Sequence, residues 1–228
     1  MRGSYFTPGF FRFLGELRRN NNRDWFLKNK HRYESEVREP MLNFIADFGP
    51  ELRKISPHLV ADPRPNGGSM MRVYRDTRFA RDKSPYKTNA AAHFHHVSQK
   101  HIRAPGFYFH LAPEEVFVGA GMWHPEAAPL AKIRDAIVEA PSRWKKAIGD
   151  ERFAAVYSLG GDSLKRPPNG YDPKHSLIAD LKRKDFIAGA ELSEEDACSP
   201  RFMSRFVDIC AASAPLMKFL TTAIGLPW

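Results

Sequence analysis

The sequence predicts an α+β domain, in which an antiparallel β-meander sheet is packed with N-terminal and C-terminal helices. Near both ends of the chain, apolar residues recur at the helical spacing of three and four residues, whereas in the middle they alternate with polar residues. The links between the alternating segments are short, as is typical of neighbouring antiparallel strands. For a chain of 228 residues, of which 43% are hydrophobic, we expect a single domain over residues 1–228.

The N-terminal part of the chain is predicted to be helical. Thr7-Pro8 should begin a first helix, because Thr can cap a helix and Pro suits its first position. Asn20 to Asn22 should end this helix and cap a second one over about residues 23–48. Pro40 is expected to kink or restart the second helix, because a proline inside a helix removes a hydrogen bond. Gly49-Pro50 should end it.

The central part is predicted to form the sheet. Alternation begins at residues 71–74, where Met71 and Val73 alternate with Arg72 and Tyr74. The link Ala112-Pro113-Glu114 is short enough for a hairpin, so its two flanking strands should be antiparallel. Further strands are expected at residues 88–96, 106–111, 115–122 and 186–192.

Helices are expected to resume in the C-terminal half. They are predicted at residues 125–140 and 142–148, in a short helix capped by Asp172-Pro173, and in a final helix that opens at Ser199-Pro200. Residues 159–171 should form a loop, because Gly-Gly, Pro-Pro and Asn-Gly pairs interrupt regular structure there.

Composition favours a protein of the cytoplasm without a membrane segment. The mean hydropathy is -0.47, and no stretch approaches the roughly 18 consecutive apolar residues of a membrane-spanning helix. The two cysteines do not indicate a disulfide framework, so a reducing compartment fits. The net charge of +9 is unevenly distributed: residues 64–110 hold nine Lys or Arg and two acids. Such a concentration of positive charge attracts anions.

The most distinctive segment runs from Arg72 to Lys87 and connects two predicted strands. Its basic residues outnumber its two acids, Asp76 and Asp82. Arginine side chains can bind a carboxylate or phosphate through two parallel hydrogen bonds. We therefore expect a small anionic ligand, with Arg72, Arg75, Arg78, Tyr86, Lys87 and Tyr108 as binding residues. The candidates for acid–base catalysis are Asp76, Asp82 and Lys83.

Other interpretations stay open. The same bases, with Tyr74, Phe79 and Tyr86 for stacking, are compatible with a nucleic acid or another polyanion. The segment is equally compatible with a structural loop held by ion pairs. His93 and His95 share a strand face but lack a third ligand nearby, so no metal site is expected. No sequence motif indicates a cofactor or an oligomeric state.

Two pieces of the basic segment resemble a known signature. Arg75-Asp-Thr-Arg-Phe79 and Asp82-Lys-Ser-Pro-Tyr-Lys-Thr88 are similar to the motif of the mainly bacterial domain of unknown function 2461 family. Residues 21–26, 119–123 and 164–171 fit the same family, so the resemblance extends over nearly the whole chain. It implies one domain and supplies no activity. The histidine cluster lies outside this pattern.

Overall fold

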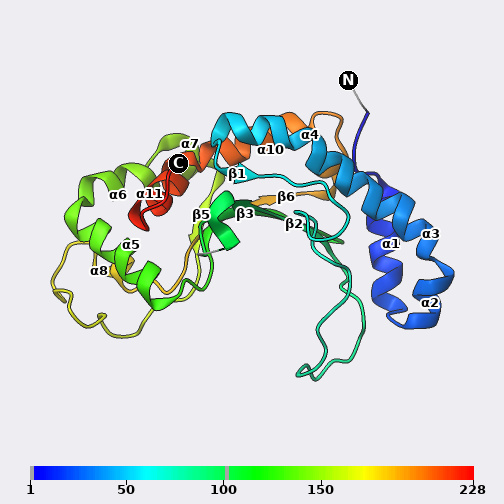
Figure 1. Ribbon diagram of the computed structural model, residues 1–228, viewed down its shortest axis with the longest axis horizontal. Coiled ribbons are helices and arrows are strands. Elements are labelled where there is room, and N and C mark those ends of the chain that lie inside the picture. The colour runs from blue at the N-terminus through cyan, green and yellow to red at the C-terminus, as the bar shows by residue number, and fades with distance from the viewer. Residues whose placement is uncertain (1–2, 101–102) are drawn as a thin grey trace.

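A six-stranded sheet occupies the centre of the protein (Figure 1). The computed structural model describes residues 3–100 and 103–228. The strands are ordered β1-β2-β3-β4-β6-β5, and all neighbours are antiparallel. The predicted α+β class and the meander of three consecutive strands are therefore confirmed. The strands are β1 (Leu59–Val60), β2 (Ala90–His96), β3 (Gly106–Ala112), β4 (Glu115–Met122), β5 (Ser158–Gly160) and β6 (Phe186–Leu192).

Helices from both ends of the chain lie against one face of this sheet. Figure 1 shows α4 (Glu39–Ile55) and α10 (Phe202–Ala212) across that face, with α1 (Pro8–Arg19) at one end. At the other end lie α5 (Ala127–Glu139), α6 (Pro141–Ile148) and α11 (Ala214–Ala223). The shorter segments are α2 (Arg23–Lys28), α3 (Lys30–Arg32), a π-helix η1 (Tyr33–Arg38), a 3₁₀ helix η2 (Val97–Lys100), α7 (Glu151–Val156), α8 (Ile178–Leu181) and α9 (Glu194–Cys198).

Aromatic rings fill the space between the sheet and these helices. Phe109 of β3 lies at their centre, with its ring centroid 5.2 Å from that of Phe44 and 4.8 Å from that of Phe206. Each of these side chains is fully buried. Aromatic pairs at such separations stabilise a core by more than the apolar area they bury. Alternation along β3 turns Phe107, Phe109 and Leu111 to this core, and Tyr108 and His110 to the opposite face.

The N-terminal helices differ from the prediction in three places. Thr7 occupies the cap position of α1, but its side chain makes no capping hydrogen bond. The expected helix over residues 23–48 is interrupted at Asn29 and by the π-helix, before α4 restarts beside Pro40 as predicted. The expected end at Gly49-Pro50 is wrong, because α4 continues to Ile55 with Pro50 inside it. Leu52 in the final turns is fully buried, and this burial offsets part of the local cost of the proline.

Differences in the rest of the chain concern short elements. Residues 71–74 form no regular strand, only isolated bridges from Met70 to Ala92 and from Tyr74 to Tyr86. The predicted loop at 159–171 contributes its first residues to β5, and the helix expected after Asp172-Pro173 begins only at Ile178. The final helix is broken into α10 and α11, which meet at 48°. In the described ranges no single helix could span a membrane, although these two together have a suitable length and composition.

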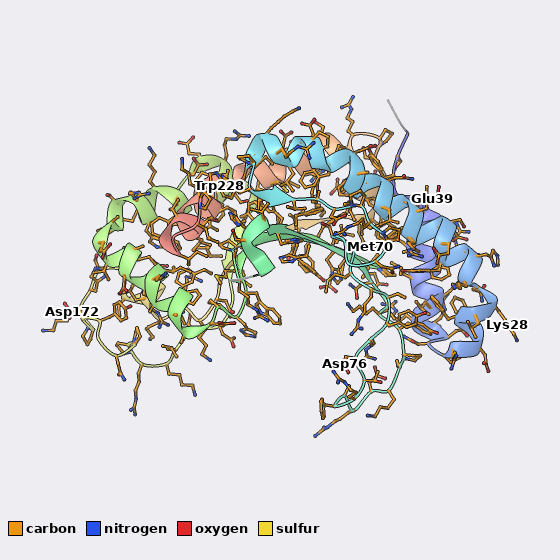
Figure 2. All side chains as sticks on the ribbon, in the orientation of Figure 1. Lys28, Glu39, Met70, Asp76, Asp172 and Trp228 are labelled. Carbon is orange, nitrogen blue, oxygen red and sulfur yellow. The ribbon has the colours of Figure 1, made fainter. Side chains whose placement is uncertain are left out.

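Among the described residues, no helix lies across the opposite face of the sheet (Figure 1). In Figure 1 two parts of the chain descend beside this face like the legs of an arch. One leg is the segment Arg72–Lys87, called here the basic hairpin, and the other is α5 with the loop before α8. In Figure 2 the labelled Asp76 lies in the first leg and Asp172 in the second, with open space between them.

Candidate functional site

The basic hairpin extends from the edge of the sheet and is anchored at its base. Main-chain hydrogen bonds join Lys87 N to Val73 O (2.7 Å) and Arg75 N to Pro85 O (2.9 Å). On its outer side, the ring of Tyr86 stacks on Phe26 of α2 with centroids 4.0 Å apart. Both main-chain polar groups of Tyr86 also bond to the side-chain amide of Asn21, at 2.9 and 3.1 Å. The base of the hairpin is therefore fixed to the turn between α1 and α2.

Both acids of the hairpin are held in ion pairs. Asp82 pairs with Arg75, and Asp76 pairs with Arg78 at 2.7 Å. Hydrogen bonds from Ser84, with the Arg75 guanidinium, lower the pKa of Asp82 to about 2. Arg78 likewise lowers the pKa of Asp76. The two carboxylates are thus ionised at neutral pH and directed at arginines of their own hairpin.

The predicted site residues of the hairpin point in different directions. Lys83 donates to the carbonyl oxygen of Thr77 at 2.9 Å, near the tip. Tyr86 is only 4% exposed, so its ring is covered by α2. Lys87 follows Tyr86 at the base of the hairpin, where its main-chain nitrogen donates to Val73 O. The structure therefore separates Lys87 from the groups of the tip and places Tyr86 in the core.

Lys87 is a half-buried cation. Burial lowers the pKa of its ammonium group, and the positive charge of Arg72 lowers it further. Two like charges therefore lie near each other at the base of the hairpin. Within residues 3–100 and 103–228, no carboxylate forms an ion pair with Lys87. An unpaired, partly desolvated cation is costly to keep, and an anion bound beside it would offset that cost.

The uncovered side of the sheet, called here the open face, carries a mixed set of side chains. The register of the strands aligns His93, Tyr108, Gly119, Gly189 and Ser158 in one row across five strands. Alternation adds further members on either side of this row. The open face comprises His93 and His95 of β2, Tyr108 and His110 of β3, Phe117, Gly119 and Gly121 of β4, and Ile187, Gly189 and Glu191 of β6.

Two glycines leave the middle of the open face without side chains. Gly119 and Gly189 are direct neighbours on β4 and β6. A Cβ atom on Gly189 would meet nothing within 4 Å, and one on Gly119 would meet only Tyr108, with its closest approach at 3.6 Å. Neither glycine is therefore needed for packing. Glycines in a strand interior often mark a place where a ligand approaches the backbone closely.

A polar network borders these glycines. The hydroxyl of Tyr108 lies 3.1 Å from Nδ1 of His110, and the amide nitrogen of Asn89 lies 3.5 Å from the same atom. Nε2 of His110 is 3.7 Å from a carboxylate oxygen of Glu115. With donors on the Nδ1 side, the proton of the neutral ring belongs on Nε2, towards Glu115. The phenol and the imidazole are thus hydrogen-bonded, and Nε2, which is buried and has no hydrogen-bond partner among the described residues, lies close to the carboxylate.

Burial shifts the pKa values of three side chains on this face. It raises the pKa of Tyr108, as does Glu115, and it lowers the pKa of His110 against the opposing effect of Glu115. The pKa of His93 falls to about 4 through burial, with a smaller effect of His95. His93 and His110 are therefore neutral at pH 7, so each ring has one donor and one acceptor.

Sequence reasoning identified part of this arrangement. Tyr108 was predicted as a binding residue and lies on the open face, as do His93 and His95, which share one strand face as expected. Among the described residues, no three His, Cys, Asp or Glu side chains are arranged to hold a metal ion. Asn89 and Glu115 were missed. Only the strand register, which brings them to His110, could have indicated them.

Comparison with known proteins yields one match. A family model described as "Conserved hypothetical protein (DUF2461)" matches residues 9–219. This match confirms the resemblance seen in the basic hairpin and includes the hairpin, the open face and both legs of the arch. No curated protein and no solved structure matches the chain significantly.

Proposed function

The chain belongs to the DUF2461 family of conserved hypothetical proteins, and we propose that its open face binds a small ligand that carries a phosphate or carboxylate group. Lys87 pairs with the anionic group, and the rest of the ligand lies on the bare backbone at Gly119 and Gly189. The observation that carries this proposal is the half-buried ammonium group of Lys87 beside Arg72, without a carboxylate partner among the described residues.

The anion end of this site is separate from the tip of the hairpin. Arg75 and Arg78 already have carboxylate partners, and Lys83 donates to main-chain oxygens. We assign these tip residues, with Asp76 and Asp82, to holding the hairpin in shape. Lys87 and Arg72, at the base, keep positive charge available for a ligand. The side-chain amide of Asn89, two residues beyond Lys87, is a neutral donor at the same end of the face.

The polar network supplies acid–base chemistry in this proposal. Tyr108 can take a proton from a ligand group while its own hydroxyl proton passes to Nδ1 of His110. The resulting imidazolium is stabilised by Glu115, 3.7 Å from Nε2. A return of both protons restores the starting state. Tyr108, a residue expected to bind ligand, therefore becomes the proton-transfer group in place of Asp76, Asp82 or Lys83.

Calorimetric titration with inorganic phosphate and with succinate tests the anion site. Wild-type protein should bind at least one of these probes, and Lys87→Met should bind it about 10- to 100-fold more weakly, since a hydrogen bond to a charged group contributes about 1.5–3 kcal/mol. Lys83→Met is the matched control, because it removes a lysine of the same hairpin. Equal binding by wild type and Lys87→Met, or loss with Lys83→Met alone, would contradict the proposal.

A polyanion is the second candidate, favoured by the tip of the hairpin. Phe79 is 96% exposed there, between Arg78 and Arg81, which is a suitable arrangement for a stacked base between phosphates. Affinity for single-stranded oligonucleotides that falls steeply with salt and is lost in Phe79→Ala would support this role. We place either activity in the cytoplasm, where the free thiols Cys198 and Cys210 would stay reduced.

A further inference from the structure

His124 and Asp185 form a hydrogen-bonded pair outside the network of Tyr108. Asp185 precedes β6 and is 2% exposed. Its Oδ1 atom accepts from the main-chain nitrogen of His124 at 2.7 Å and lies 3.0 Å from Nδ1 of the same residue. Its Oδ2 atom accepts from the main-chain nitrogen of Asp162 at 3.0 Å. The buried carboxylate thus accepts a main-chain hydrogen bond at each oxygen, and Nδ1 of the imidazole lies against one of them.

The backbone of His124 is in an unfavourable conformation for a residue with a side chain. Its φ angle is +46°, in the left-handed region that few residues other than glycine adopt, although histidine, like asparagine and aspartate, is found there more often than most. The main-chain bond to Asp185 does not depend on which side chain occupies the position. A role confined to shaping this turn would be filled at lower cost by glycine. Non-glycine residues held in this region cluster at functional sites.

The pairing determines which nitrogen of the ring can react. Because Nδ1 lies 3.0 Å from a carboxylate oxygen, we infer that the proton of the neutral ring belongs on Nδ1 and that Nε2 keeps its lone pair. The side chain of His124 is 54% exposed, so this lone pair is accessible. The indole of Trp123 stacks on the imidazole at 4.2 Å and is itself 67% exposed. A basic nitrogen therefore lies beside an aromatic surface that a flat ring can cover.

We propose that His124, oriented by Asp185, is a general base for a ligand with a flat ring that stacks on Trp123. Nε2 removes a proton from a water molecule beside that ring, and the water oxygen forms a bond to the carbonyl carbon of an ester carried by the ring. The proton on Nδ1 stays in place, and the imidazolium formed is stabilised by the buried carboxylate of Asp185. The bond between the carbonyl carbon and the ring oxygen then breaks, and the departing ring oxygen takes the proton from Nε2. This site is independent of the anion site at Lys87.

Hydrolysis of p-nitrophenyl acetate is a suitable probe, because it combines a flat ring with an ester that water can cleave to acetate and p-nitrophenol. His124→Asn is the informative variant, since asparagine tolerates the left-handed region and can still donate to Asp185. We expect this variant to hydrolyse the ester at least about tenfold more slowly than wild type. The loss should be smaller than the ~10²–10⁴-fold typical of a positioned acid–base group, because the probe is not a natural ligand. His31→Asn, at an exposed histidine elsewhere, should change the rate little.

Three outcomes would overturn the proposal. The first is an unchanged rate in His124→Asn. The second is a melting temperature several degrees lower in that variant, which would make the ring structural. The third needs no substitution: ¹⁵N chemical shifts of the wild-type ring that place the proton on Nε2 would leave no lone pair to act as a base. Failure of phosphate or succinate to bind would contradict the role of Lys87 alone and leave His124 unaffected.

Discussion

Replacement of Asn21 by Ala should loosen the basic hairpin. The side-chain amide of Asn21 pairs with the main-chain oxygen and nitrogen of Tyr86, 65 residues away, much as a neighbouring strand would. Tyr86 is 4% exposed, so water cannot easily replace this partner. The substitution therefore removes two hydrogen bonds and leaves a buried donor and a buried acceptor unsatisfied.

The size of the effect follows from those two bonds. A typical hydrogen bond contributes about 0.5–1.5 kcal/mol, and a buried group left without a partner costs about 1–3 kcal/mol. For the pair we expect a loss of about 2–4 kcal/mol in the free energy of unfolding. In a chain of this length that corresponds to a fall of roughly 4–16 °C in melting temperature.

Urea denaturation and hydrogen exchange together test this expectation. Asn20→Ala is the matched control, because Asn20 is exposed and, within the described part of the chain, its side chain bonds only to the carbonyl oxygen of Glu16. The control should lose less than about 1 kcal/mol. In Asn21→Ala, the amide of Tyr86 should exchange faster than in wild type. Unchanged exchange at Tyr86, or equal destabilisation by the two variants, would refute the account of the anchor.

Three further predictions concern the core, the site and the tip. Phe109→Ala, at a fully buried position, should lower the free energy of unfolding by about 3–5 kcal/mol. Phe79→Ala, at a 96% exposed position, should change it by less than about 0.5 kcal/mol. Urea titration of both variants checks the contrast. Lys87→Met should stabilise the protein at pH 7, because the folded state lowers the pKa of Lys87 and so disfavours its charged form. Urea titrations at several pH values should show that the gain in the free energy of unfolding shrinks as the pH rises through the lowered pKa of Lys87 towards the ordinary lysine value of about 10.4. The Asp82 carboxyl should titrate near its pKa of about 2 by NMR, and Ser84→Ala should move the midpoint upward; any stability it contributes is present above about pH 4 and is lost as the pH falls towards 2. A midpoint near 4 in wild type would contradict this assignment.

The sheet was the most predictable part of the fold. The bounds predicted from alternation for residues 115–122 and 186–192 are those of β4 and β6, because these strands present one face to the core and the other to the open side. Helix ends were less predictable, since they depend on contacts distant in sequence. Leu52, for example, lies beyond Pro50 in α4 and is fully buried, and the contacts that bury it are not visible in the local sequence. The break between α10 and α11 had a visible signal in Pro215, which lies in the first turn of α11.

The candidate site was predicted only in part. The charge count identified the basic hairpin, but it could not distinguish cations with partners from those without. Arg75 and Arg78 find carboxylates within their own loop, whereas Lys87 does not in the described residues. The open face was not predictable, because which side of a sheet stays uncovered depends on where the helices pack. Asp185 was missed because 61 residues separate it from His124 in the sequence.

The ends of the sheet bear on how the protein behaves in concentrated solution. Its outermost strands are β1, with two residues, and β5, with three. The outer side of β2 is further occupied by the bridge from Met70 to Ala92. The longer strands therefore lie inside the sheet, and a strand from another molecule would find few free main-chain groups with which to pair. Short edge strands of this kind are a known protection against aggregation through β-strand pairing.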